Sequence, residues 1–338
     1  MGNMLLYLFF FMFIIIYLRV LFGPKGFFRE KQWDEWNDEA KATRNAEKAA
    51  RKAEAKIQAE KKIRHTTEVA MTPDLTSYQK WFAEYVEGYA QADQHDQQYI
   101  DLKREHTLRV FGNAKQITAS LSLDSSTMNV ALLGALFHDV GRFEQYNIYK
   151  TYSDQNSVNH GLLGCRILKQ ESILEHEPKE IQHAVRATVA LHNKYALPSA
   201  LPKHIRIATH IVRDSDKLDI FPVLVSNFTH DGSKSDVITM GLEDCPTEYT
   251  YKILQNVLNG ESVRYGDMRY INDFKLLLSS WVFGLEYRAS MQLLHDRGVM
   301  ERLLNTLPAL PDMEEVKLVV REEMQRVLTS NISEEEGT

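Results

Sequence analysis

The sequence predicts an all-α protein in which a helical bundle follows an N-terminal transmembrane helix and a helical stalk. Residues 4–22 are almost uninterruptedly apolar, and residues 27–67 are rich in Ala, Lys, Arg and Glu. After Thr72, apolar residues recur at helical spacing, with almost no strand-like alternation. We therefore expect a transmembrane anchor (1–23), a charged helical stalk (24–71), a main helical domain (72–310), and a C-terminal helix with an acidic tail (311–338).

The apolar N-terminal segment, MLLYLFFFMFIIIYLRVLF, contains only one charged residue, Arg19. A helix of this length spans roughly 28 Å, which is close to the hydrocarbon thickness of a bilayer. The segment lacks a preceding basic region and a small-residue cleavage site, so an anchor is favoured over a cleaved signal peptide. Because Lys and Arg follow the span and none precedes it, we expect a single-pass membrane protein whose main domain lies in the cytoplasm.

The sequence of the stalk and the overall composition limit which partners the chain is expected to bind. The stalk favours helix by propensity but has no apolar stripe wide enough to bury, so we expect it to be solvated. A coiled-coil homodimer is an alternative, although Leu and Ile do not fill the a and d positions. The net charge of −6 argues against a stable nucleic-acid partner. Cys165 and Cys245 are isolated, which excludes a thiolate zinc motif and fits a reducing compartment.

The main domain begins with two helices, expected at residues 75–91 and 96–112. The first is amphipathic, and the second places His106 on its inward face, four residues after Leu102 and four before Val110. A core histidine bonded to a carbonyl group is the ordinary interpretation of His106 taken alone.

The next helix, over residues 128–137, is apolar all round, as is typical of a helix buried in the centre of a bundle. It ends in His138 and Asp139 and is closed by Gly141. An imidazole and a carboxylate are costly in such an interior unless something compensates them. A divalent metal ion does so, whereas the ordinary alternative is a chance pair with a solvated carboxylate.

Further histidines and acids follow at helical spacing. Residues 146–157 are polar and predict a loop or lid; His160 and His192 then lie on the inward faces of the next two helices. The helix expected over residues 203–221 contains three acids, and its periodicity does not choose among them. These acids are Asp214, Asp216 and Asp219. Long helices are expected from residue 270 to residue 307.

The phrases HDVGRFEQ, NHG, LHNKY and RDSDKLD resemble the metal-site segments of the HD-domain metal-dependent phosphohydrolase superfamily. The resemblance covers about residues 78–221 and implies an HD fold for the main domain. It also implies that Asp216 is the last metal ligand. Asp214 is then expected to orient a ligand imidazole by contacting the ring nitrogen that does not bind the metal.

Imidazole and carboxylate ligands without thiolate suit Mn, Fe, Co, Ni or Zn. The resemblance implies two such ions per chain, with Asp139 bridging them. The first ion would be held by His106, His138, Asp139 and Asp216, and the second by Asp139, His160 and His192. We expect Asp139, Arg142 and Lys217 to act in catalysis, and Arg109, Arg142, Lys194 and Lys217 to bind substrate phosphate. For each basic residue, a surface or helix-terminal salt bridge is the alternative.

The resulting hypothesis is a membrane-anchored phosphohydrolase of a phosphorylated small molecule, such as a nucleotide or cyclic nucleotide. The two additional histidines, His160 and His192, favour a phosphodiesterase. One alternative is a nucleotidase or nucleoside-triphosphate hydrolase with one metal. Another is a nucleotide-sensing HD module without turnover. A metal-dependent oxygenase is a further alternative, but the additional ligands of that related group are not matched convincingly here.

Overall fold

The computed structural model describes residues 73–194, 196–229, 242–261, 263 and 265–330. The expected anchor and stalk lie outside these residues. Within them the chain forms helices and connecting turns, with an isolated β-bridge between Glu243 and Tyr270 and no strand, which confirms the all-α prediction. None of the helices in this described part is long and apolar enough to cross a bilayer.

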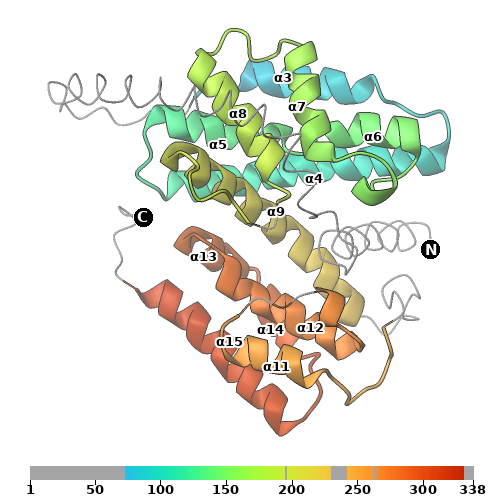
Figure 1. Cartoon of the computed structure of the whole chain (residues 1–338), viewed down its shortest axis with the longest axis vertical. Helices are drawn as coiled ribbons and strands as arrows, with labels where there is room; N and C mark the ends of the chain where they lie inside the picture. The colour runs from blue at the N-terminus through green and yellow to red at the C-terminus, as the bar shows by residue number, and fades with distance from the viewer. Residues whose placement is uncertain (1–72, 195, 230–241, 262, 264, 331–338) are drawn as a thin grey trace, which may run out of the picture.

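The N-terminal half packs around one central helix (Figure 1). Its helices are α3 (Thr76–Glu87), α4 (Gln94–Ala119), α5 (Ser125–Phe137), α6 (Gly141–Tyr149), α7 (His160–Gln170), α8 (Lys179–Leu191) and α9 (Lys203–Thr229). Helix α5 contacts α3, α4, α8 and α9, and its residues from Val130 to Phe137 are all buried. The all-round apolar sequence of α5 therefore reflects partners on every side.

Three helix starts in this half are fixed by capping side chains. Asp93 accepts a hydrogen bond from Asp96 N at the start of α4, and Asp124 accepts one from Thr127 N at the start of α5. Asn159 accepts a hydrogen bond from Leu162 N, so α7 begins at His160. Each cap satisfies a backbone donor that the first helical turn leaves open.

Helix α9 runs from the N-terminal group into a second, C-terminal group of helices (Figure 1). This group contains α11 (Tyr251–Leu258), α12 (Ile271–Ser279), η3 (Ser280–Gly284), α13 (Arg288–Asp296), α14 (Val299–Leu304) and α15 (Pro311–Thr329). The expectation of long helices over residues 270–307 is wrong. The 3-10 turn η3 and Gly298, whose φ of 58° lies in the left-handed region, divide the segment into short helices.

The segment between α6 and α7 is more ordered than the expected loop. Helix α6 continues to Tyr149 and ends where Lys150 adopts a left-handed φ of 51°. Beyond it, the side chain of Tyr152 is buried, and its hydroxyl donates to Tyr99 O at 2.9 Å. A short 3-10 turn, η1 (Asp154–Asn156), precedes α7.

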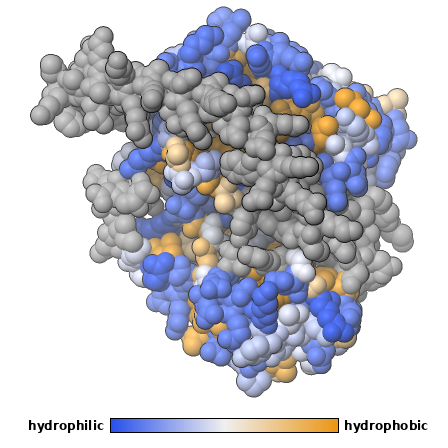
Figure 2. Space-filling model, in the orientation of Figure 1, coloured by the Kyte–Doolittle hydropathy of each residue, from blue (hydrophilic) through white to orange (hydrophobic). Residues whose placement is uncertain are grey.

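Helices α6 and α7 cross at very short range because Gly141 has no side chain. A Cβ atom at Gly141 would overlap the carbonyl oxygen of His160 and would lie 2.7 Å from Gly164 N. The crossing brings the turn after α5, which contains Asp139, beside His160, the first residue of α7. Figure 2 shows that hydrophilic residues cover most of the described surface on the face it presents.

Candidate metal centre

Five helices bring the six predicted metal ligands together. They are His106 on α4, His138 and Asp139 at the end of α5, His160 at the start of α7, His192 at the end of α8, and Asp216 on α9. The four histidines and Asp139 are buried, and the Asp216 side chain is 25% exposed. Residues far apart in the sequence thus meet in one polar cluster inside an apolar domain.

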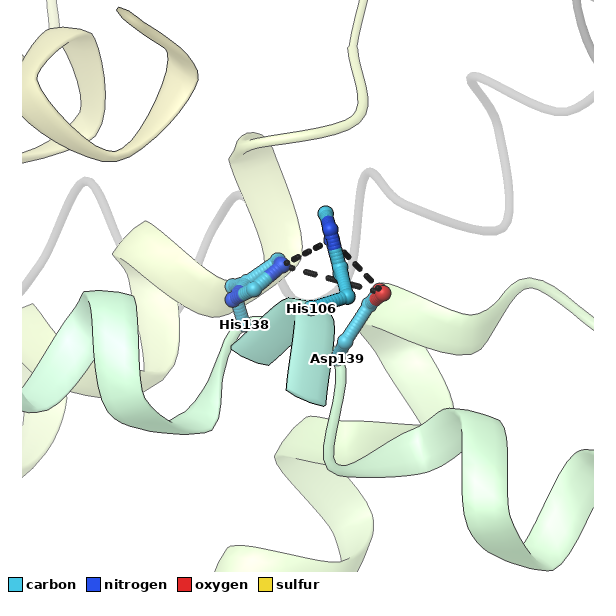
Figure 3. Close-up of side chains that lie close together, drawn as sticks. All are labelled: His106, His138 and Asp139. Atoms are coloured by element: carbon cyan, nitrogen blue, oxygen red, sulfur yellow. Dashed lines mark hydrogen bonds and ion pairs between the residues drawn. The ribbon is translucent and has the colours of Figure 1, made fainter. Parts of the chain in front are cut away.

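The first half of the cluster contains His106 and His138. Asp139 lies between this pair of histidines and the second half of the cluster. In Figure 3 the side chains of His106, His138 and Asp139 point toward one another. The Nε2 atoms of the two imidazoles are 3.3 Å apart, and Asp139 Oδ2 lies 3.5 Å from His106 Nε2 and 3.7 Å from His138 Nε2. Asp216 Oδ1 lies 3.3 Å from His106 Nε2.

The second half repeats this arrangement with His160 and His192. Their Nε2 atoms are 3.1 Å apart, and Asp139 Oδ1 lies 3.4 Å from His160 Nε2 and 3.9 Å from His192 Nε2. The two oxygens of Asp139 therefore face different histidine pairs. This is the geometry that a carboxylate bridging two cations requires.

Two of the histidines are held by backbone carbonyls one helical turn earlier. His138 Nδ1 lies 2.8 Å from Ala135 O, and His192 Nδ1 lies 2.7 Å from Val189 O. A carbonyl oxygen only accepts hydrogen bonds, so each Nδ1 carries the proton. The neutral imidazole then presents the lone pair of Nε2 to the cluster.

The other two histidines are held by carboxylates. His106 Nδ1 lies 2.7 Å from Asp219 Oδ2, and His160 Nδ1 lies 2.8 Å from Asp154 Oδ2. An ionised carboxylate also only accepts, which again places the proton on Nδ1 and the lone pair on Nε2. A carboxylate behind a ligand imidazole fixes its orientation and increases its basicity.

These hydrogen bonds make the cluster fit divalent metal ions. With Nδ1 protonated, each Nε2 to Nε2 contact sets one lone pair against another, and neither nitrogen of the neutral pair can donate. In addition, Asp216 Oδ1 is buried without a hydrogen-bond partner. A cation between the imidazoles would satisfy both features.

Residues 104–220 match the family described as HD domain. The chain contains an HD domain. The match confirms the resemblance seen in the sequence, and it spans all six residues of the cluster. Comparisons with curated proteins and with solved structures give no significant match.

Burial favours the neutral form of three of the four imidazoles in the cluster. It lowers the pKa of His138 and His160, and it lowers the pKa of His192 to about 3. Burial also disfavours the charged form of His106, but the nearby carboxylates of Asp216 and Asp219 outweigh it and raise the pKa. Neutral imidazoles are the form that binds metal.

Sequence analysis assigned no role to three residues that contact the ligands. Lys103 is buried, and its Nζ lies 2.7 Å from Asp139 Oδ2. Against the effect of burial, this ammonium holds the pKa of Asp139 well below its usual range. Lys103 lies three residues before His106 on α4, so helical spacing offers a signal for it. The other two are Asp154 and Asp219.

The interpretation of Asp214 as the residue that orients a ligand imidazole is wrong. Its Oδ2 accepts hydrogen bonds from the backbone N–H groups of Glu286 and Tyr287 at 3.0 and 3.2 Å. Asp219 takes that position instead. It lies one helical turn after Asp216, on the side of α9 that faces His106, whereas Asp214 faces the C-terminal group.

Both of the expected phosphate-binding arginines contact these supporting carboxylates. Arg109 Nε donates to Asp219 Oδ1 at 2.6 Å. Arg142 is buried, and its Nη1 lies 2.9 Å from Asp154 Oδ1 and 2.5 Å from Tyr152 O. Both guanidinium groups therefore stabilise the carboxylates that support the ligand histidines. A role in binding phosphate stays a prediction.

The two expected phosphate-binding lysines are close to metal ligands in the sequence, since Lys194 follows His192 by two residues and Lys217 follows Asp216 directly. Lys217 Nζ donates to Gly284 O at 2.5 Å, which joins α9 to the C-terminal group. Lys194 is half-buried just after α8, and burial lowers the pKa of its ammonium despite the nearby charge of Asp154. Neither contact tests the predicted role in substrate binding.

Proposed function

We propose that this HD domain is a two-metal phosphohydrolase, anchored to a membrane by residues 4–22, whose substrate is a nucleotide or cyclic nucleotide phosphoester. The observation that carries this proposal is the inward orientation of four imidazole Nε2 atoms around the two oxygens of Asp139. The HD domain match supports the metal-dependent hydrolase class. The substrate and the membrane attachment are inferred from the sequence.

The chain's own residues would hold the ions as two sets that share Asp139. His106, His138 and Asp216 would complete the first set, and His160 and His192 the second. These nitrogen and oxygen ligands suit Mn, Fe, Co, Ni or Zn. Two divalent ions sharing a bridging carboxylate would supply Lewis-acid catalysis for in-line displacement at a phosphodiester.

The charges around the cluster favour an anionic substrate. The carboxylates that contact a ligand imidazole exceed by one the cations that contact these carboxylates, and two divalent ions would change this to an excess of three positive charges. The carboxylates are Asp139, Asp154, Asp216 and Asp219, and the cations are Lys103, Arg109 and Arg142. We propose that Lys194 and Lys217, next to His192 and Asp216 in the sequence, contact the phosphate.

The metal and the activity can be tested together on the purified full-length chain, kept in detergent because of its apolar N-terminal segment. Metal content is measured by elemental analysis, and hydrolysis is measured on nucleotides, cyclic nucleotides and a generic phosphodiester. His160→Gln removes one proposed ligand. His176→Gln is the matched control, because the His176 side chain is 89% exposed.

We expect about two metal ions in the wild type and the His176→Gln variant. His160→Gln should retain about one ion and lose phosphodiesterase activity. A wild type that binds one ion and is unaffected by His160→Gln would favour the one-metal nucleotidase. A chain that binds no metal under any loading condition would refute the hydrolase and favour a nucleotide-sensing module.

The proposed membrane anchor has its own test. The full-length chain should float with phosphatidylcholine vesicles in a density gradient. Replacing Ile14 and Ile15 with Asp should abolish flotation, because each acid at the centre of a spanning helix costs about 2.5–3.5 kcal/mol. Flotation that the double substitution leaves unchanged would refute the anchor without affecting the hydrolase proposal.

A further inference from the structure

The carboxylates that contact the Nδ1 atoms of His106 and His160 are held in different ways. Asp219 lies within helix α9, so the helix backbone fixes its position. Asp154 instead lies in the segment between α6 and α7, here called the 151–157 segment. The orientation of His160 therefore depends on the conformation of a short connecting segment, whereas that of His106 depends on a helix.

Two buried side chains of α6 hold this segment against the domain. Arg142 Nη1 donates to Tyr152 O at 2.5 Å and to Asp154 Oδ1 at 2.9 Å. Gln145 Nε2 lies 3.0 Å from Asp154 Oδ1 and 2.8 Å from Ser157 Oγ. Both ends of the segment are thus attached to one helix by charge-assisted or amide hydrogen bonds.

A third attachment comes from α4. The ring of Tyr152 is buried, and its hydroxyl donates to Tyr99 O at 2.9 Å. The ring also lies 4.9 Å from that of Tyr146, measured between centroids. Burying an aromatic ring with a satisfied hydroxyl stabilises the docked segment.

In the docked segment, Asp154 contacts His160 with both oxygens. Asp154 Oδ1 and Oδ2 lie 2.9 and 2.8 Å from His160 Nδ1, and the Asp154 side chain is 10% exposed. This contact directs His160 Nε2 toward His192 Nε2 and Asp139 Oδ1. Without Asp154, the ring of His160 would lose the carboxylate that accepts its Nδ1 proton and helps to fix its orientation.

We propose that Asp154 is the positioning residue of the second metal set, and that docking of the 151–157 segment and binding of the second ion stabilise each other. The inference rests on the metal-binding part of the proposed function. An ion that binds better when His160 is held must, by linkage, stabilise the docked segment by the same free energy. The first set, supported from within α9, is independent of this coupling.

The experiment compares two isosteric substitutions in the full-length chain, Asp154→Asn and Asp219→Asn. Each replaces one supporting carboxylate with an amide, so each serves as the control for the other. Zn²⁺ binding is followed by titration, with stoichiometry checked by elemental analysis. Hydrogen exchange of the peptide that covers residues 151–157 is measured after each equivalent of Zn²⁺.

We expect Asp154→Asn to weaken the second binding event about 10–100-fold and to leave the first unchanged. Asp219→Asn should weaken the first event by a similar factor. In the wild type, exchange in the 151–157 segment should slow with the second equivalent of Zn²⁺ and not with the first. In Asp154→Asn this slowing should disappear.

Several outcomes would overturn the inference. It fails if Asp154→Asn binds both equivalents with wild-type affinity, or if both variants weaken the same event. It also fails if hydrogen exchange in the wild-type 151–157 segment does not respond to the second equivalent of Zn²⁺. This test uses the wild type alone, so it remains valid even if a variant does not fold. A wild type that binds no Zn²⁺ would instead refute the proposed function.

Discussion

The two histidine pairs of the centre are built alike but supported differently. Each pair has one imidazole held by a carbonyl three residues earlier and one held by a carboxylate. The pair His106 and His138 also has Asp216 beside it, and its supporting carboxylate lies in a helix. For the pair His160 and His192, the supporting carboxylate lies in a connecting segment.

This difference teaches that similar ligands need not make equivalent sites. Carboxylates near a cation raise its affinity, and ligands on rigid helices are positioned more precisely than ligands supported by loops. We therefore expect the His106 and His138 pair to bind the tighter of the two ions.

The largest effect is expected at Asp139, the residue that the two pairs share. Asp139→Ala should abolish metal binding at both. It should also lower the free energy of unfolding by about 3–5 kcal/mol, because it removes the carboxylate partner of the buried Lys103 ammonium. Urea unfolding measures this loss. Combining Asp139→Ala with Lys103→Met should recover part of it, and strictly additive losses would contradict the pairing.

Removing one ligand from each pair should separate the two sites. His138→Gln should eliminate the tighter binding event, and His192→Gln should eliminate the weaker one, each leaving about one ion per chain. Both imidazoles end a helix and are held by a carbonyl, so the two variants are matched. Isothermal titration resolves the two affinities. If His192→Gln eliminates both events, the pairs do not form separate sites.

The glycine at the crossing of α6 and α7 should affect the second pair selectively. Gly141→Ala forces α6 away from His160 O and should cost about 1–3 kcal/mol of stability by overpacking. Gly112→Ala is the control, because a Cβ atom there meets nothing within 4 Å and the helix should gain about 0.4–1 kcal/mol. Urea unfolding and metal titration compare them, and equal weakening of both ions would contradict the selectivity.

The smallest effect concerns Cys165, which reports on the packing of α7 against α8. Burial raises the pKa of its thiol to about 12, and its Sγ lies 2.9 Å from Arg186 O. Below that pH the thiolate is the minor form, so labelling by iodoacetamide should rise about tenfold per pH unit. At pH 8 it should be over 100-fold slower than for a free thiol. A Cys245→Ser background isolates Cys165, and fast labelling there would contradict the packing.

The helical class and the ligand types could be predicted from the sequence because both depend on local pattern. A period of 3.6 residues separates helix from strand, and the all-round apolar run before His138 indicates a buried helix. The order of histidines and acids, with the resemblance to the HD superfamily, then singled out the residues that the structure brings together. The boundaries within residues 270–307 were not predictable, because a 3-10 turn and a left-handed Gly298 interrupt an otherwise continuous apolar spacing.

The support of those ligands could be decided only by the fold. Asp214 and Asp219 occur on one helix with similar apolar neighbours, and only the packing of α9 against α4 shows that Asp219 reaches His106. Helical periodicity in the sequence does not indicate a role for Asp154, because the path of a connecting segment sets its position. A contact between side chains depends on the relative orientation of elements distant in sequence, and local spacing carries no information about that orientation.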